Sequence, residues 1–144
     1  MTTFPTGRRT FFLQEIGEPD ANVLRIVVAE ASAQEPEASI PGTDIVARPV
    51  TLVANEPSWQ LTWDSYIAYA VRNESYWQSD NRPDSDDRLI VRSQSAFLDF
   101  VRASTFASDE YPGKRLHWEL ICADHVVDVV SISGPDIARL PTGT

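Results

Sequence analysis

Residues 115–133, RLHWELICADHVVDVVSIS, decide the fold of this chain. Two runs rich in apolar and β-branched residues flank the polar pair Asp124-His125, a pattern that predicts two antiparallel strands joined by a tight turn. With a two-residue turn at this pair, Leu120 lies opposite Val129. This hairpin is the clearest structural element that the sequence predicts.

The predicted register divides the hairpin into two faces. One face is apolar and consists of Leu116, Trp118, Leu120, Cys122, Val127 and Val129. The other mixes ionisable and apolar side chains, namely His117, Glu119, Asp128, Ile121, Val130 and Ile132. A three-residue loop would instead turn Asp128 into the core opposite Leu120. Burying an unpaired carboxylate is costly, so the two-residue turn is favoured, with Asp128 facing Ile121 diagonally next to Glu119.

Short strands are also predicted along the rest of the chain. The candidates are segments rich in β-branched and aromatic residues, namely 11–16, 23–28, 44–54, 58–63, 66–76 and 89–91. Turn residues in Gly17–Asp20 predict a hairpin between the first two. Pro49 has no N–H to donate, so its strand is expected at a sheet edge or to break there. Segment 66–76 also fits a helix that begins at Asp64, although its composition favours the strand.

One segment changes to a helical period. In residues 93–105, SQSAFLDFVRAST, the i, i+3, i+4 spacing of a helix face is seen at Phe97, Phe100, Val101 and Ser104. Ser93 and Ser95 are the candidate N-caps. The polar segments 31–42 and 78–88 predict loops, and the second is expected to be exposed and mobile. Together these elements predict a single globular domain over residues 1–144.

The expected fold class is α+β, mostly β. Every connection between neighbouring strands can be short, which favours antiparallel pairing. We therefore expect an antiparallel curved sheet or barrel-like sandwich of about seven strands, with one short helix at about 95–104 packed against it.

The composition constrains the class of partner. The 144 residues include 12 basic and 21 acidic ones, a formal net charge of −9. An acidic field repels phosphate backbones, so nucleic-acid binding is not expected, whereas a basic protein partner would be attracted. The N-terminal residues lack the apolar stretch of a signal peptide, no apolar run approaches a membrane span, and there is one cysteine. We therefore expect a soluble cytoplasmic protein that does not bind membranes.

Familiar catalytic motifs are absent from the sequence, which contains no Walker A pattern, GxGxxG, GxSxG, HExxH or CxxC. Cys122 falls on the apolar face of the predicted hairpin, so we expect a buried structural thiol rather than a nucleophile. The segment DNRPDSDD, residues 80–87, lacks the glycine and glutamate of a calcium-binding loop and is expected to be a solvated loop. No cofactor and no metal are predicted, and no catalytic residue can be named.

Two groups of residues remain as candidate ligand-binding sites. His117 and Glu119 lie two residues apart on one strand, and the predicted register brings Asp128 next to them. Such a trio suits general acid–base chemistry or a weak metal site, but it is also an ordinary polar outer face of a sheet, which the spacing favours. The sequence therefore predicts a convergence that a structure must test.

The second group stands in WQLTWDSYIAYAVRNESYW, residues 59–77, where aromatic side chains precede a polar cluster. An aromatic wall beside a few polar groups is typical of a small-ligand pocket, although aromatic residues more often fill cores. The candidate ligand-binding residues in this stretch are Tyr69, Arg72, Asn73 and Glu74.

Three hypotheses follow. The leading one is a small acidic, non-enzymatic binding or protective protein, in its concrete form an immunity-type inhibitor of a basic partner. The alternative is a small-ligand-binding domain or enzyme whose pocket lies between residues 59–77 and the C-terminal hairpin. A third is self-association of the chain through its aromatic stretch. The second requires that Arg72, Glu74, His117, Glu119 and Asp128 meet at one cavity.

Overall fold

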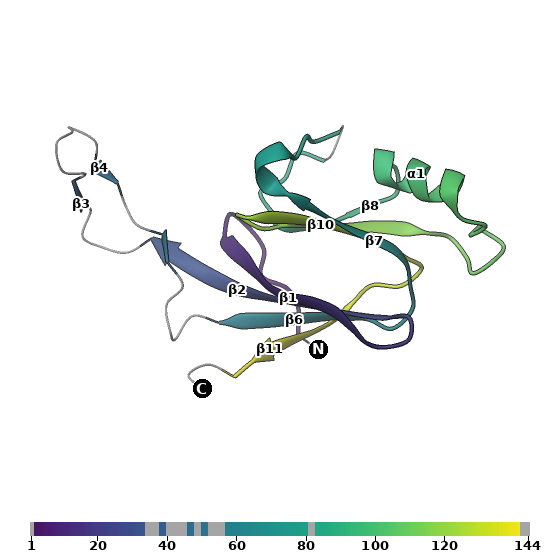
Figure 1. Ribbon diagram of the computed structural model, residues 1–144, viewed down its shortest axis with the longest axis horizontal. Helices are drawn as coiled ribbons and strands as arrows, with labels where there is room; N and C mark the ends of the chain where they lie inside the picture. The colour runs from purple at the N-terminus through teal and green to yellow at the C-terminus, as the bar shows by residue number, and fades with distance from the viewer. Residues whose placement is uncertain are drawn as a thin grey trace.

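The computed structural model describes residues 2–33, 38–39, 46–47, 50–51, 57–80 and 83–141. Its described strands form two main antiparallel sheets that stack face to face (Figure 1). The first sheet has the order β1 (Thr10–Asp20), β2 (Val23–Ala33), β6 (Ser58–Trp63), β11 (Asp136–Leu140), and β5 (Val50–Thr51) pairs with β2. The second has the order β7 (Tyr66–Asn73), β10 (His125–Ser131), β9 (Leu116–Ile121), β8 (Leu89–Arg92).

Four smaller elements complete the described chain. Strands β3 (Ala38–Ser39) and β4 (Val46–Ala47) pair with each other. A 3-10 turn, η1 (Glu74–Tyr76), follows β7, and helix α1 (Ala96–Ser104) lies on the side of the second sheet that faces away from the first (Figure 1). The predicted class, α+β and mostly β with antiparallel sheets and one short helix, is confirmed, with open sheets rather than a closed barrel. In the described part of the chain, no helix has the length and apolarity that a membrane crossing requires.

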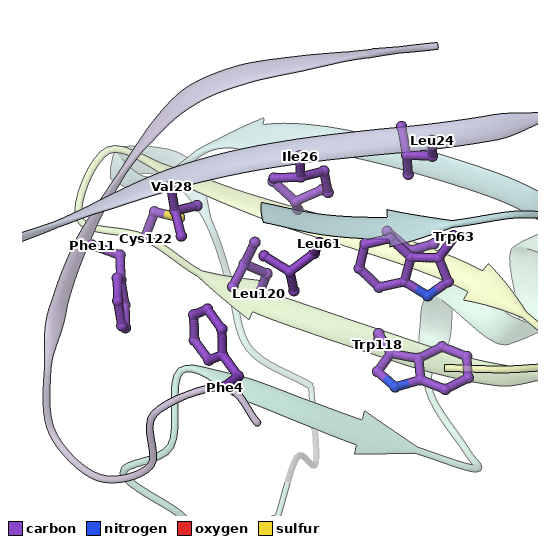
Figure 2. Close-up of a cluster of buried hydrophobic side chains, with 12 residues drawn as sticks. Phe4, Phe11, Leu24, Ile26, Val28, Leu61, Trp63, Trp118, Leu120 and Cys122 are labelled. Carbon is purple, nitrogen blue, oxygen red and sulfur yellow. The ribbon is translucent and has the colours of Figure 1, made fainter. Parts of the chain in front are cut away.

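The main core fills the space between the two sheets. Alternate residues of β2, among them Ile26, meet Leu120 and its neighbours from the predicted apolar face of the hairpin (Figure 2). Trp63 and Trp118 contact each other edge to face across the layer, with ring centroids 6.4 Å apart. The apolar face predicted from the sequence is therefore confirmed, because alternate side chains of a strand point to the same face of the sheet.

The turn of the C-terminal hairpin differs from the prediction by one residue. Leu120 pairs with Val127 rather than with Val129, and the Cys122 N–H donates to the His125 carbonyl at 2.8 Å. The two turn residues are therefore Ala123 and Asp124. Tertiary contacts fix this position, since Ala123 N–H donates to Phe11 O at 2.8 Å, and Asp124 Oδ1 accepts from the Leu13 N–H at 3.2 Å. Moving the turn by one residue shifts the partner of each residue by two, which leaves the two faces unchanged.

The remaining strand predictions are confirmed in part. The first hairpin is confirmed as β1 and β2, but its predicted turn at Gly17–Asp20 is wrong: these residues continue β1, and the turn lies at Ala21-Asn22, where Asn22 has a positive φ of 66°. Segment 58–63 is confirmed as β6. Segment 66–76 is a strand only to Asn73, because β7 pairs with β10 up to that residue. The loop predicted at 31–42 is wrong for residues 31–33, where β2 continues and pairs with β5, and for Ala38–Ser39, which form β3. Pro49 lies outside the described residues, and β11 is missing from the predicted elements because it is short and weakly patterned.

Helix α1 begins as predicted, with Ser95 as N-cap. Its buried face consists of Leu98 and Val101, which pack on Val130 with the half-buried Phe97. Phe100, predicted on this face, is 61% exposed. The described part of segment 78–88 is anchored to the domain rather than simply solvated, since Asp87 Oδ1 accepts from the Gly7 N–H at 2.7 Å.

Candidate functional site

The polar face of the C-terminal hairpin is buried beneath helix α1. His117 and Glu119 on β9 and Asp128 on β10 are each no more than 1% exposed. Glu119 lies directly opposite Asp128, rather than diagonally as predicted, because the turn has moved. One donor atom from each of the three lies within 4.8 Å of the others. The predicted convergence is therefore real, but the outer polar face that the spacing favoured is wrong, because α1 covers it.

Asp128 is bonded through both of its carboxylate oxygens. Its Oδ1 lies 2.7 Å from Nε2 of His117. Its Oδ2 accepts from Nε and Nη2 of Arg72, at 3.2 and 2.7 Å. Arg72 reaches this position from β7, where Ala70 pairs with Asp128, and its side chain stays 44% exposed. A buried carboxylate is tolerated here because two partners compensate it, one of them charged.

His117 links Asp128 to the start of helix α1. Its Nδ1 lies 2.8 Å from Oγ of Ser95, and the same oxygen accepts from the Leu98 N–H at 3.0 Å. One assignment of hydrogens satisfies every contact: Ser95 donates its hydroxyl hydrogen to Nδ1, and Nε2–H donates to Asp128. The result is a continuous chain from the helix N-terminus to the sheet, in which each bond polarises the next.

The residue types of a nucleophilic hydrolase triad occur together here, as Ser95, His117 and Asp128. Their arrangement has a structural role instead. A nucleophilic serine must present its oxygen to substrate. Ser95 is 8% exposed, its oxygen already caps the helix, and it does not line the neighbouring cavity. The chain of bonds therefore fastens α1 to the sheet and keeps the Ser95 hydroxyl away from the cavity.

A second group of ion pairs adjoins the first. Arg92, 4% exposed on β8, places Nη1 2.7 Å from Oδ1 of Asp80 and 3.4 Å from Oε2 of Glu119. Oδ2 of Asp80 accepts from the Ala96 N–H at 2.8 Å, so this carboxylate also caps the helix. The hydrogen bond from Arg92 holds the pKa of Asp80 down at about 2. Two guanidinium groups thus balance the buried carboxylates, although among the described residues Arg92 Nε has no partner.

These ion pairs bear on the metal question. Histidine and carboxylate donors this close could hold a divalent cation in principle. Here Asp128 is bonded to Arg72, and Glu119 lies against Arg92. A cation would have to sit beside two guanidinium charges or displace them, which costs the buried carboxylates their present partners. The donor set fits an internal ion-pair network better than it fits a metal.

A cavity of about 270 Å³ opens beside the network. It is lined by Ala70, Arg72, Gln78, Asp80, Ala96, Phe97, Phe100, His117 and Asp128. The polar groups come from the network and the apolar wall from the two phenylalanines, whose rings stack with centroids 6.1 Å apart. The volume lies just below the range usual for small-ligand pockets, about 300–1,000 Å³.

The structure separates the other predicted site residues from this cavity. Tyr69 is on the opposite face of β7 and donates its hydroxyl to Oε2 of Glu18 at 3.1 Å. Asn73 caps η1 through a 3.0 Å bond from the Ser75 N–H. Glu74 lines a different cavity, about 170 Å³, together with Arg9, Arg88 and four other residues. Of the five residues required to meet, only Arg72, His117 and Asp128 line one cavity, with Glu119 behind them.

Three members of the network escaped the sequence-based reasoning. Arg92 could have been found, because it shares a strand face with Ile90 and would point to the side on which the following helix packs. Ser95 was predicted as a cap but not as the partner of His117. Asp80 gives no local signal, since its role depends on a loop returning to the helix N-terminus.

The comparisons with known proteins found no similarity that could assign this site. No protein-family model, no curated protein and no solved structure matches the chain.

Proposed function

We propose that this chain is a small, non-enzymatic binding protein that engages a basic protein partner, in its concrete form an inhibitor that shields or neutralises that partner. The observation that carries the proposal is the internal bonding of the polar cluster around His117, which resembles a catalytic site. Both oxygens of Asp128 and both ring nitrogens of His117 have partners within the protein. A group that acts directly on a substrate as acid or base needs one of these atoms to be free. A base that acts through Ser95 would need that hydroxyl to be exposed, whereas Ser95 is 8% exposed.

The charge of the chain supports a basic partner. A net charge of −9 on 144 residues produces a field that speeds the encounter with a positive surface and repels nucleic acid. The proposal places the protein in the cytoplasm, because its single buried cysteine requires no oxidising compartment.

The proposal is tested by affinity capture followed by a defined binding measurement. The immobilised chain is exposed to native lysate at low and at high salt, and each retained protein is then purified and titrated against the free chain. We expect a basic protein that binds directly and weakens steeply as salt shortens the Debye length from about 10 Å at 0.1 M. Binding partners that are all acidic or neutral, or affinities that ignore salt, would contradict the proposal.

A covalent probe tests the non-enzymatic part. A fluorophosphonate that reacts with activated serine hydroxyls should leave Ser95 unlabelled, because this oxygen is buried and already accepts from Leu98. Labelling in the wild type that disappears in Ser95→Ala would show an activated nucleophile and overturn that part of the proposal.

A second candidate function is small-ligand binding in the cavity beside the network. Its support is the lining, which combines the half-exposed Arg72 with an apolar wall from Phe97 and Phe100. A ligand with an anionic group and a small apolar part would suit this arrangement. Ala70→Leu should fill the cavity without touching the ion pairs. Thermal stabilisation by a metabolite that persists in Ala70→Leu would place the ligand elsewhere.

A further inference from the structure

The loop that follows helix α1 carries an exposed aromatic pair. Phe106 is 88% exposed and Tyr111 is 69% exposed. Their rings stack nearly parallel, with centroids 6.5 Å apart and planes at 11°. Two large apolar rings left in solvent beside each other contribute little to the core, so their position calls for another explanation.

Backbone hydrogen bonds hold this pair in place. Ser108 N–H donates to the Tyr111 carbonyl at 2.7 Å, and Tyr111 N–H donates back to the Ser108 carbonyl at 3.1 Å. Thr105 Oγ1 donates to Val101 O at 2.8 Å and accepts from the Ala107 N–H at 3.3 Å, which ties the loop to the end of the helix. The backbone that carries the two rings is thus held before any partner arrives, which lowers the entropic cost of binding.

The pair forms one wall of a groove between the loop after α1 and the start of β7. The groove has a volume of about 400 Å³, and its lining includes Tyr66, Ile67, Phe106, Tyr111, Pro112 and Ile132. Ile132, 40% exposed, and the half-buried Ile67 supply further apolar surface. The lining contains no charged side chain, so an occupant would meet aromatic and aliphatic surface first.

Acidic residues stand close to the groove along the chain. Four of them are within two positions of a lining residue, and a chain can reach only about 7 Å in two steps; they are Asp20, Asp64, Asp109 and Glu110. Lys114 is the one basic residue within the same limit. Asp109 lies 3.6 Å from Arg115, so its charge is partly balanced. The residues next to the groove are therefore acidic on balance, and we call them its acidic rim.

We propose that this groove, the Phe106–Tyr111 groove, receives an arginine or lysine side chain of the basic partner, an inference that rests on the proposed function. A cation over the face of an aromatic ring is attracted by the ring quadrupole, and the acidic rim adds long-range attraction. The aliphatic stem of the same side chain covers Ile132 and Ile67. A neutral apolar segment would use the lining but not the rim, and an acidic segment would be repelled by it.

The test uses a defined probe and matched variants. A fluorescent peptide that alternates arginine with glycine is titrated by fluorescence polarisation at low salt, beside the same peptide with citrulline in place of arginine. We expect Phe106→Ala and Tyr111→Ala each to weaken binding about two- to fivefold, the factor that corresponds to an exposed cation–π contact. Tyr76→Ala removes an aromatic side chain that is 86% exposed but lies outside the groove, and it should leave the affinity unchanged. Neither groove ring is needed for the core, so circular dichroism should show all three variants folded.

The outcomes separate the two proposals. Absence of arginine-peptide binding by the wild type would overturn the proposed function and this inference with it. If Phe106→Ala, Tyr111→Ala and Tyr76→Ala all bound the arginine peptide with equal affinity, only the assignment of the binding site to the groove would be overturned. Equal affinity for the citrulline peptide would overturn the cation. Light scattering could instead show a wild-type dimer that Phe106→Ala converts to a monomer. The groove would then bind a second copy of the chain, and its assignment to a basic partner would be overturned.

Discussion

His117 and Asp128 lie 2.7 Å apart, Nε2 to Oδ1, beneath helix α1 on the outer face of the second sheet. Each is at most 1% exposed, so the contact is shielded from bulk water. Through Ser95 on one side and Arg72 on the other, the pair joins the start of the helix to the edge strand β7. The stability of the helix–sheet layer should therefore depend on this pair.

Asp128→Ala should destabilise the protein strongly. The change leaves His117 and Arg72 without their shared buried partner, and removal of one member of a buried ion pair typically costs about 3–5 kcal/mol. Urea unfolding at pH 7 should show a lower midpoint with an unchanged slope. Asp86→Ala is the matched control, because Asp86 is 66% exposed in its 3.5 Å pair with Arg8, and it should change stability by less than about 1 kcal/mol. Similar losses in both variants would refute the role of the network.

Ser95→Ala should lower the stability of the helix and expose the dependence of His117 on its partner. Loss of an N-cap hydroxyl costs about 1–2 kcal/mol. The cost should lie at the upper end of this range or above it, because Nδ1 of His117 also loses its bond. Ser93→Ala, at an exposed position two residues earlier, is the control. The measurement is urea unfolding followed by far-ultraviolet circular dichroism, and equal effects of the two variants would contradict the assignment.

Asp80→Asn should alter how stability depends on acid. Arg92 lowers the pKa of Asp80 to about 2, from the ordinary value of 3.8. For a depressed carboxyl pKa, the stabilisation is complete above the unfolded value and is lost as the pH falls toward the folded one. The stability difference between the wild type and Asp80→Asn should therefore be constant above about pH 4 and shrink between pH 4 and 2. Unfolding free energies across this series test it, with Asp84→Asn as a control for the change in net charge at pH 7.

If the stability difference between the wild type and Asp80→Asn grew as the pH fell, the prediction would be wrong. It would mean that the ion pair with Arg92 does not contribute in the folded protein.

Cys122 should be inert in the native state. Burial raises the pKa of its thiol to about 12, and the side chain is 2% exposed. Iodoacetamide at pH 8 should label it slowly in the native protein and rapidly in urea. Because the folded pKa is raised above 9.0, the stabilisation from the buried thiol is complete below pH 9 and declines as the pH rises toward 12.

The matched control for thiol reactivity is Ala123→Cys in a Cys122→Ala background. Ala123 is exposed in the hairpin turn, one residue away, so its replacement should be labelled at the rate of a free thiol. Fast labelling of native wild-type Cys122 would show that the hairpin opens far more readily than its core contacts indicate.

Much of the fold could be predicted because it depends on local pattern. The alternation in residues 115–133 assigned Trp118 and Leu120 to one face and His117 to the other, and the structure confirms both assignments. The helical spacing after Ser95 likewise predicted α1 and its cap. A hydrophobic period of two or of 3.6 residues is visible in the sequence, so no tertiary information is needed to find it.

Three features could not be predicted in this way: the exact position of the turn, what packs on each face of the hairpin, and the bonding partners of the polar residues. The turn moved to Ala123-Asp124 because Phe11 and Leu13, more than a hundred residues earlier, supply its hydrogen-bond partners. The hairpin face that carries His117, Glu119 and Asp128 was expected to be an outer polar face, but α1 covers it. Burial depends on what packs on a strand, and the sequence of the strand alone does not contain that information.

By itself, therefore, the sequence determined which side chains of each element point together, since backbone geometry imposes that on any chain. Tertiary structure alone decided that Arg72 joins Asp128 and His117, that Asp80 returns to cap α1 beside Arg92, and that Phe106 and Tyr111 stay in solvent. These relationships join segments far apart in the chain. Their energies depend on desolvation and on distance in space, neither of which a local pattern contains.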